Sequence, residues 1–136
     1  MPVIEEIIRK NDDNSLSFGN YKLDKKTKVL DFLVDDSKYK AKSFREVTKL
    51  KKDGKLVYES IPGTVIHNFI TNEHKTTFNI EGYANTQITL ELTPKQTYEF
   101  KVDDEVVALI KATPTGKINL TIEATDDPKF IELNKK

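Results

Sequence analysis

The stretch TQITLELTPKQTYEFKVDDEVVALIKATPTGKINLTIEA, residues 86–124, decides the fold class. Apolar and polar residues alternate in three of its segments, at 87–92, 97–102 and 117–123. Successive side chains of a β-strand point to opposite faces, so this period of two predicts strands with one buried and one solvated face. The apolar run VVALIKA, at 106–112, lacks the alternation and is interpreted as a strand of the core.

The segments upstream of residue 86 continue the same pattern. Strand-like stretches cover 16–23, 29–36, 38–44, 48–60, 65–71 and 76–83. Asp53-Gly54 interrupts the fourth stretch, and this pair tolerates the positive φ angles of a tight hairpin turn. Turn residues separate the stretches at intervals typical of sandwiches. The sequence therefore predicts an all-β fold, an antiparallel β-sandwich that is fibronectin-III/immunoglobulin-like or jelly-roll-like.

The two ends of the chain lack the clear alternation and set the predicted boundaries. Ile4, Ile7 and Ile8 have helical spacing, which predicts at most a short amino-terminal helix or strand. No repeat or linker interrupts the 136 residues, so one sandwich domain is expected. The predicted division is a peripheral segment at 1–13, the sandwich at 14–124 and a carboxy-terminal tail at 125–136.

The charge balance and the absence of cysteine exclude several classes of function. Basic and acidic residues each number 22, so the basic excess that nucleic-acid or membrane-surface binding normally needs is missing. The chain has no cysteine, which excludes disulfides, thiolate metal sites and cysteine nucleophiles. The first residues carry acids where a secretory leader needs a basic region. The cytoplasm is therefore the expected location, with association to a particle or surface after release as the alternative.

His67 is the most prominent candidate for chemistry. In a strand that runs from 64 to 70, His67 would share a face with Val65 and Phe69. An imidazole there would serve as a base or a metal ligand. No serine, carboxylate or second histidine stands at the spacing of a local triad or metal motif. His67 is therefore interpreted as an interface or core anchor, together with Tyr58 and Phe69.

Acidic pairs are the remaining candidates for a site. Four Asp-Asp dipeptides occur, at 12–13, 35–36, 103–104 and 126–127. Such oxygens can bind Ca²⁺, but the spacing of a calcium-binding loop is missing and aspartate is also favoured in turns. No glycine-rich phosphate loop or paired-carboxylate motif is present. The sequence thus predicts no catalytic, cofactor-binding or metal-binding residue, and a protein that is not an enzyme.

The carboxy-terminal half resembles a known fold family. Leu-x-Pro, Thr-Tyr, an acidic turn and a Thr/Pro/Gly turn separate its strands, as in the last strands of fibronectin-III-like or immunoglobulin-like sandwiches. This resemblance implies that Tyr98 is a corner anchor whose hydroxyl bonds back to the preceding turn.

A wider resemblance covers most of the chain. Residues 4–21, 43–69 and 86–100 together resemble small clostridial β-sandwich proteins that carry a transferred endosialidase label. Endosialidases themselves are large β-propeller enzymes with an arginine-rich site, whereas this chain has 136 residues and only Arg9 and Arg45. No catalytic residue is carried over from that label.

A structural role agrees best with these observations. The expected function is that of a self-assembling subunit, in a homo-oligomer, fibre or particle, with the chain itself as partner. Val3, Ile4, Ile7 and Ile8 form the expected assembly segment, which either packs on its own domain or adds to the sheet of a neighbour. A carbohydrate-binding or other accessory ligand-binding module is the alternative, and a small hydrolase that uses His67 is the third hypothesis.

Overall fold

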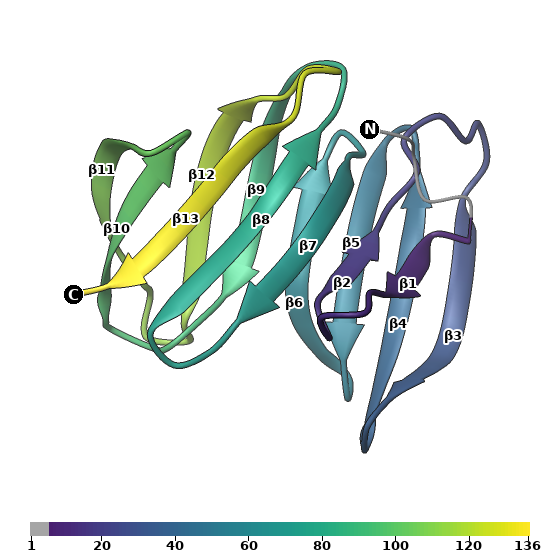
Figure 1. Ribbon diagram of the computed structural model, residues 1–136, viewed down its shortest axis with the longest axis horizontal. Helices are drawn as coiled ribbons and strands as arrows, with labels where there is room; N and C mark the ends of the chain where they lie inside the picture. Colours follow the sequence, from purple (N-terminus) through teal and green to yellow (C-terminus); the bar gives the residue numbers. More distant parts are fainter. Residues whose placement is uncertain (1–5) are drawn as a thin grey trace.

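The computed structural model describes residues 6–136, which form thirteen strands and no helix within that range (Figure 1). The strands build two antiparallel sheets, and one hydrophobic core lies between them. This architecture is a β-sandwich and confirms the fold class that the alternation predicted. The short amino-terminal element is a strand and not a helix, since Ile8–Lys10 pair with the next strand.

The two sheets contain seven and six strands. The first runs in the order β1 (Ile8–Lys10), β2 (Leu16–Phe18), β7 (Val65–Thr71), β8 (Lys75–Glu81), β13 (Lys129–Lys135), β10 (Thr97–Val102) and β11 (Glu105–Lys111). The second runs in the order β12 (Lys117–Glu123), β9 (Asn85–Glu91), β6 (Lys55–Ile61), β5 (Val47–Lys52), β4 (Ser37–Phe44) and β3 (Thr27–Val34). The free edges are therefore β1 and β11 in one sheet and β12 and β3 in the other.

Tight turns close the hairpins where the sequence predicted them. Asp53 and Gly54 have φ angles of 49° and 82° between β5 and β6, as a two-residue hairpin turn requires. Asp103 and Asp104 do the same between β10 and β11, with φ angles of 49° and 69°. The hydroxyl of Tyr98 accepts a hydrogen bond of 3.1 Å from the Thr93 N–H, which is the anchor to the preceding turn that the resemblance implied.

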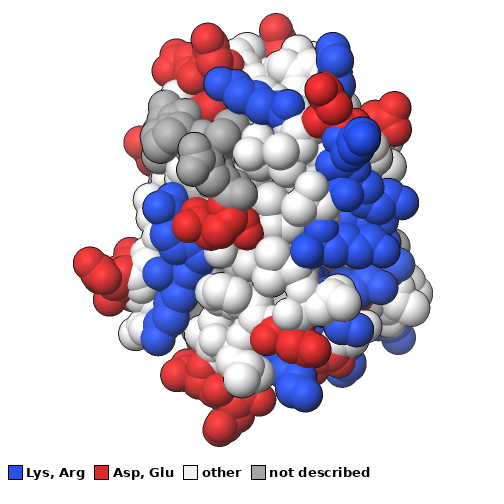
Figure 2. All heavy atoms as spheres, turned by 90° about the vertical axis from the view of Figure 1, so that its right-hand side faces the viewer, with Lys and Arg blue, Asp and Glu red and all other residues white. Residues whose placement is uncertain are grey.

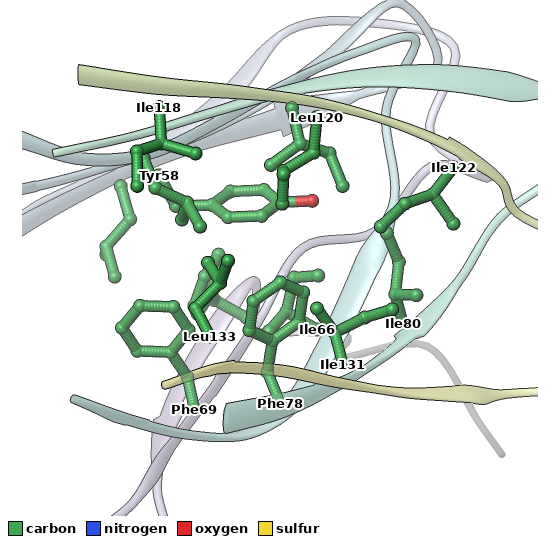
Figure 3. Packing of buried hydrophobic residues seen from close by; sticks show 14 of the residues in the cluster. Tyr58, Ile66, Phe69, Phe78, Ile80, Ile118, Leu120, Ile122, Ile131 and Leu133 are labelled. Carbon is green, nitrogen blue, oxygen red and sulfur yellow. The ribbon is translucent and has the colours of Figure 1, made fainter. Parts of the chain in front are cut away.

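Alternating side chains from both sheets fill the core (Figure 3). Ile118, Leu120 and Ile122 of β12 point towards Ile131 and Leu133 of β13, and all five are buried. Aromatic rings extend this core towards the other end of the sandwich. The Tyr58 ring lies 5.3 Å from that of Phe18 and 5.9 Å from that of Phe78, with both pairs edge to face.

A buried hydroxyl network surrounds Thr64, where the chain passes from β6 to β7 and so from one sheet to the other. The Thr64 N–H donates to Thr48 Oγ1 at 3.0 Å, and Thr48 Oγ1 donates to the Thr64 carbonyl at 2.9 Å. The Thr64 hydroxyl also lies 2.9 Å from the hydroxyls of Tyr58 and Ser60. Gly63 is required beside it, because a Cβ at that position would lie 2.1 Å from the Phe44 carbonyl oxygen.

The carboxy-terminal boundary predicted at residue 124 is wrong. Residues 129–135 form β13, which pairs with β8 on one side and β10 on the other. Ile131 and Leu133 are fully buried. The segment FIELN is short and follows a loop, so its alternation alone does not distinguish a central strand from a tail.

Two further expectations about burial are also wrong. The predicted peripheral segment 1–13 contains Ile7 and Ile8, which are buried in the core of the domain. The apolar run at 106–112 falls mostly in β11, which is an edge strand with most of its side chains in solvent and not a strand of the core. A run of apolar residues reports hydrophobicity but not the position of a strand within its sheet.

We expect Thr64→Val to lower the free energy of unfolding by about 1–3 kcal/mol. The substitution keeps the side-chain volume but deprives the buried hydroxyls of Tyr58 and Ser60 of a partner. Urea unfolding monitored by circular dichroism measures the change. Thr89→Val is the matched control, because its hydrogen bond to Asn119 is exposed, and it should change stability by less than about 0.5 kcal/mol. Equal effects of the two variants would contradict the role of the network.

Leu133→Ala and Leu109→Ala form a second matched pair. Leu133 is fully buried in β13, so we expect a loss of about 2–5 kcal/mol in unfolding free energy. Leu109 is 64% exposed in β11, so its truncation should leave the stability of a single copy, measured at a protein concentration where the chain is monomeric, within about 0.5 kcal/mol of the wild type. Thermal and urea unfolding of both variants would show the difference, and a larger effect at Leu109 would mean that the placement of these two strands is incorrect.

Candidate functional site

The side chains of His67 and Phe69 lie on opposite faces of β7. Asn68 has a φ angle of 56° and the pairing with β8 shifts between His67 and Ile70. This bulge inserts one residue and reverses the phase of the alternation. Ile66 and Phe69 therefore both enter the core, whereas His67 is on the outer side of the sheet. The prediction that His67 shares a face with Phe69 is wrong.

The environment of His67 is polar and enclosed. The residue is 7% exposed and lies opposite Asn79 of β8. Glu81, two residues further along β8, is also buried and accepts a hydrogen bond of 3.3 Å from the Tyr21 hydroxyl. Burial raises the pKa of Tyr21, and the charge of Glu81 adds to this shift. With so little of its side chain exposed, His67 offers little access to a substrate, which agrees with the prediction that it is an anchor.

Tyr58 and Phe69, the other predicted anchors, are both in the core. The two rings each contact Phe18, which lies 5.7 Å from Phe69, and so form one aromatic cluster between the sheets. Burial raises the pKa of the Tyr58 hydroxyl far above its usual range, and the hydrogen bond with Thr64 only partly opposes this shift. Of the predicted assembly segment, Ile7 and Ile8 are in the same core, while Val3 and Ile4 lie outside the described residues.

Three turn aspartates, Asp13 and Asp103 of the predicted pairs and Asp53 of the hairpin turn, bond to backbone amides. Asp53 Oδ1 accepts from the Lys38 N–H at 2.9 Å, and Asp103 Oδ1 accepts from the Phe130 N–H at 2.8 Å. Asp13 accepts from the hydroxyl and the N–H of Ser15, and these hydrogen bonds lower the pKa of Asp13. Within residues 6–136, no group of three or more acidic or histidine side chains is arranged to bind a metal ion. The expectation that the chain holds no metal-binding residue stays a prediction.

Tyr83 has the one aromatic ring that is well exposed in the described part of the chain. Its hydroxyl donates to the Arg45 carbonyl, the Arg45 guanidinium lies 5.9 Å from the ring centre, and the Tyr21 ring lies 5.6 Å away. These contacts hold the Tyr83 ring between the loop that contains it and the turn at Arg45. A carbohydrate platform would need further exposed rings beside it, and Tyr39 packs partly against the core instead.

One exposed apolar surface lies on β11, a free edge of the seven-stranded sheet. Val106, Val107 and Leu109 of β11 are 57%, 58% and 64% exposed. A bulge in the pairing of β10 with β11 turns both valines outward. The outer backbone edge of β11 has no strand beside it in the described structure. Sequence reasoning missed this surface because it read the same apolar run as core.

A second apolar surface lies on β3, a free edge of the six-stranded sheet. Leu30 and Leu33 are 61% and 64% exposed. Leu33 lies opposite Lys38, and the lysines of β4 and β5 alternate along the same outer face. Lysines are frequent in the sequence at 22–28 and 48–55, but nothing in the pattern marks the two leucines as exposed.

These features define a β-sandwich whose exposed apolar residues concentrate on two sheet edges. Comparison with protein-family models, with curated proteins and with solved structures finds no match. No helix among the described residues is long and apolar enough to cross a membrane. The sheet edges are therefore the features from which a function can be argued.

We expect Tyr58 to make the stability of the protein fall at alkaline pH. Its pKa is raised in the folded state, so its contribution is complete below about pH 10, the pKa of an unfolded tyrosine, and is lost as the pH rises above that value. Urea unfolding between pH 8 and 11 should therefore show a steeper decline for the wild type than for Tyr58→Phe, by up to about 1.4 kcal/mol per pH unit. Parallel curves would show that Tyr58 ionises normally in the folded protein.

Proposed function

We propose that this chain is a non-enzymatic, self-assembling structural protein that associates through the β11 edge. The observation that carries the proposal is the row of exposed apolar side chains on that strand, at Val106, Val107 and Leu109. Exposed apolar edges of this kind pair with other chains, and soluble monomers normally protect such edges with charges, proline or a covering segment. β11 carries charged side chains only at its two ends, Glu105 and Lys111.

Association through β11 would gain both apolar burial and backbone hydrogen bonds. Fully burying a valine or leucine side chain stabilises by about 1.5–3 kcal/mol. The outer edge of β11 also presents N–H and C=O groups to which a further strand can pair. The formal net charge of zero offers little electrostatic resistance to such contact.

The double variant Val106→Lys/Leu109→Lys tests the proposal. Both side chains are exposed, so the variant should fold like the wild type by circular dichroism. Wild-type protein should sediment above the 15.6 kDa of one chain, with a mass that rises with concentration, and the variant should sediment as a monomer. Asn85→Lys/Gln87→Lys adds the same charge to exposed positions of β9, which is not an edge strand, and should assemble like the wild type.

Two results would refute the proposal. One is a wild-type protein that stays monomeric at every concentration tested. The other is assembly of the β11 variant to the same extent as the wild type and the β9 control.

A further inference from the structure

The second exposed edge, β3, lies at the opposite end of the molecule from β11 (Figure 1). Each strand is one of the two free edges of its own sheet, and the lengths of the two strands are similar, at eight and seven residues. Each also presents exposed branched apolar side chains, namely Leu30 and Leu33 on β3 and the three residues of β11 described above. A molecule with an apolar edge at each end can contact a different copy at each end.

The surroundings of β3 are basic. The register places Lys42 of β4 between Lys28 of β3 and Lys49 of β5, on one face of the sheet. Lysine and arginine side chains form a nearly continuous column along one side of the view onto this edge (Figure 2). Loss of hydration lowers the pKa of Lys42, and the positive charges of Lys26, Lys49 and Lys28 lower it further.

A shallow hollow of about 260 Å³ lies within this basic face. Leu30 lines the hollow together with lysines of three strands, Lys28, Lys40, Lys42, Lys49 and Lys51. One carboxylate offsets part of this charge, since Glu59 lies 3.2 Å from Lys49. The hollow therefore combines an apolar residue with a positive rim and fits an apolar strand that brings acidic side chains.

The surroundings of β11 are acidic at the end where the strand begins. Asp103 and Asp104 form the turn before it and Glu105 is its first residue, while Lys111 is its last. Counted over each hairpin, β10 and β11 with their turn carry four acids against two lysines, whereas β3 and β4 with their turn carry four lysines against three aspartates. The acids of the first hairpin are Glu99, Asp103, Asp104 and Glu105, and its lysines are Lys101 and Lys111. The second hairpin carries Lys28, Lys38, Lys40 and Lys42 with Asp31, Asp35 and Asp36, and the loop before it adds Lys25 and Lys26 against Asp24.

We infer that the β3 edge is the docking surface for β11 of a second copy, so that copies associate head to tail. The inference rests on the function proposed above and specifies its geometry. Pairing of β11 with β11, or of β3 with β3, would bring together edges of the same net charge, whereas β11 against β3 brings together opposite charges. A contact between two different surfaces does not close on itself as a two-fold dimer does, and it extends into a chain unless the rotation closes a ring.

The distribution of charge along the strands also selects the direction of docking. Lys25, Lys26 and Lys28 are at the beginning of β3, and Asp35 and Asp36 follow its end. Parallel docking places the acidic turn of β11 beside these lysines and Lys111 beside these aspartates. Antiparallel docking would instead place acids against acids and lysine against lysines. The parallel arrangement is therefore the one that the charges favour.

Two blocked variants test the inference when they are mixed. Val106→Lys/Leu109→Lys blocks β11, and Leu30→Asp/Leu33→Asp blocks β3. Each variant alone should be monomeric, because every copy lacks one of the two surfaces. An equimolar mixture should form a species of twice the chain mass and no larger, because each copy retains the surface that the other lacks. Asn85→Asp/Gln87→Asp is the control for the added acids and should assemble like the wild type.

The outcomes separate the inference from the proposed function. If wild-type protein is monomeric, both fail. If wild type assembles and the β3 variant assembles equally well, then assembly does not use β3 and the head-to-tail inference alone is overturned. If both variants are monomeric but their mixture also stays monomeric, the two edges do not dock on each other and the inference is again overturned.

Engineered cysteines test the direction, because the chain contains no cysteine of its own. A disulfide requires the two Cα atoms to come within about 7 Å of each other. If the strands are parallel, Thr27→Cys in one copy should form a disulfide with Glu105→Cys in another. If they are antiparallel, Thr27→Cys should instead form a disulfide with Lys111→Cys. We expect at least a several-fold higher yield for the first pair on a non-reducing gel. A higher yield for the second pair would overturn the parallel arrangement.

Discussion

The sandwich depends on the close approach of backbones and hydroxyls where the chain crosses between its sheets. Thr64 is hydrogen-bonded through its N–H, its carbonyl and its hydroxyl, all to side chains of the six-stranded sheet. Glycine at position 63 permits this approach, since a side chain would collide with the Phe44 carbonyl. Buried hydroxyls are costly unless each has a partner, so this network fixes the sheets in one relative position.

The four free edges of the two sheets differ in the side chains that they expose. The amino-terminal edge of the seven-stranded sheet is the short β1, and the β12 edge carries polar residues on its outer face. The β11 and β3 edges carry exposed valines and leucines instead. These side chains face solvent in a single copy and do not contribute to its packing. Association between copies would bury them.

The sequence was sufficient to predict the strands of the core but not their neighbours. The alternation at 88–92 and 118–122 gave the buried faces correctly, and Asp53-Gly54 gave the hairpin, because both are local properties. Whether a strand is central or at an edge depends on distant partners, so β11 was misplaced in the core and β13 in a tail. The bulge at Asn68 places His67 and Phe69 on opposite faces of β7. The one sequence signal for this bulge is the asparagine itself, because asparagine tolerates positive φ angles.

The position of β13 has a consequence for biosynthesis. Residues 129–135 lie between β8 and β10, so the hairpin of β10 and β11 gains its neighbour in the sheet only after those residues have been made. A nascent chain on the ribosome that lacks them has an incomplete sheet and exposed apolar residues of the type that chaperones bind. Placement of β13 would then coincide with the first stable display of β11, so that in the assembly proposed above only copies with β13 in place could join.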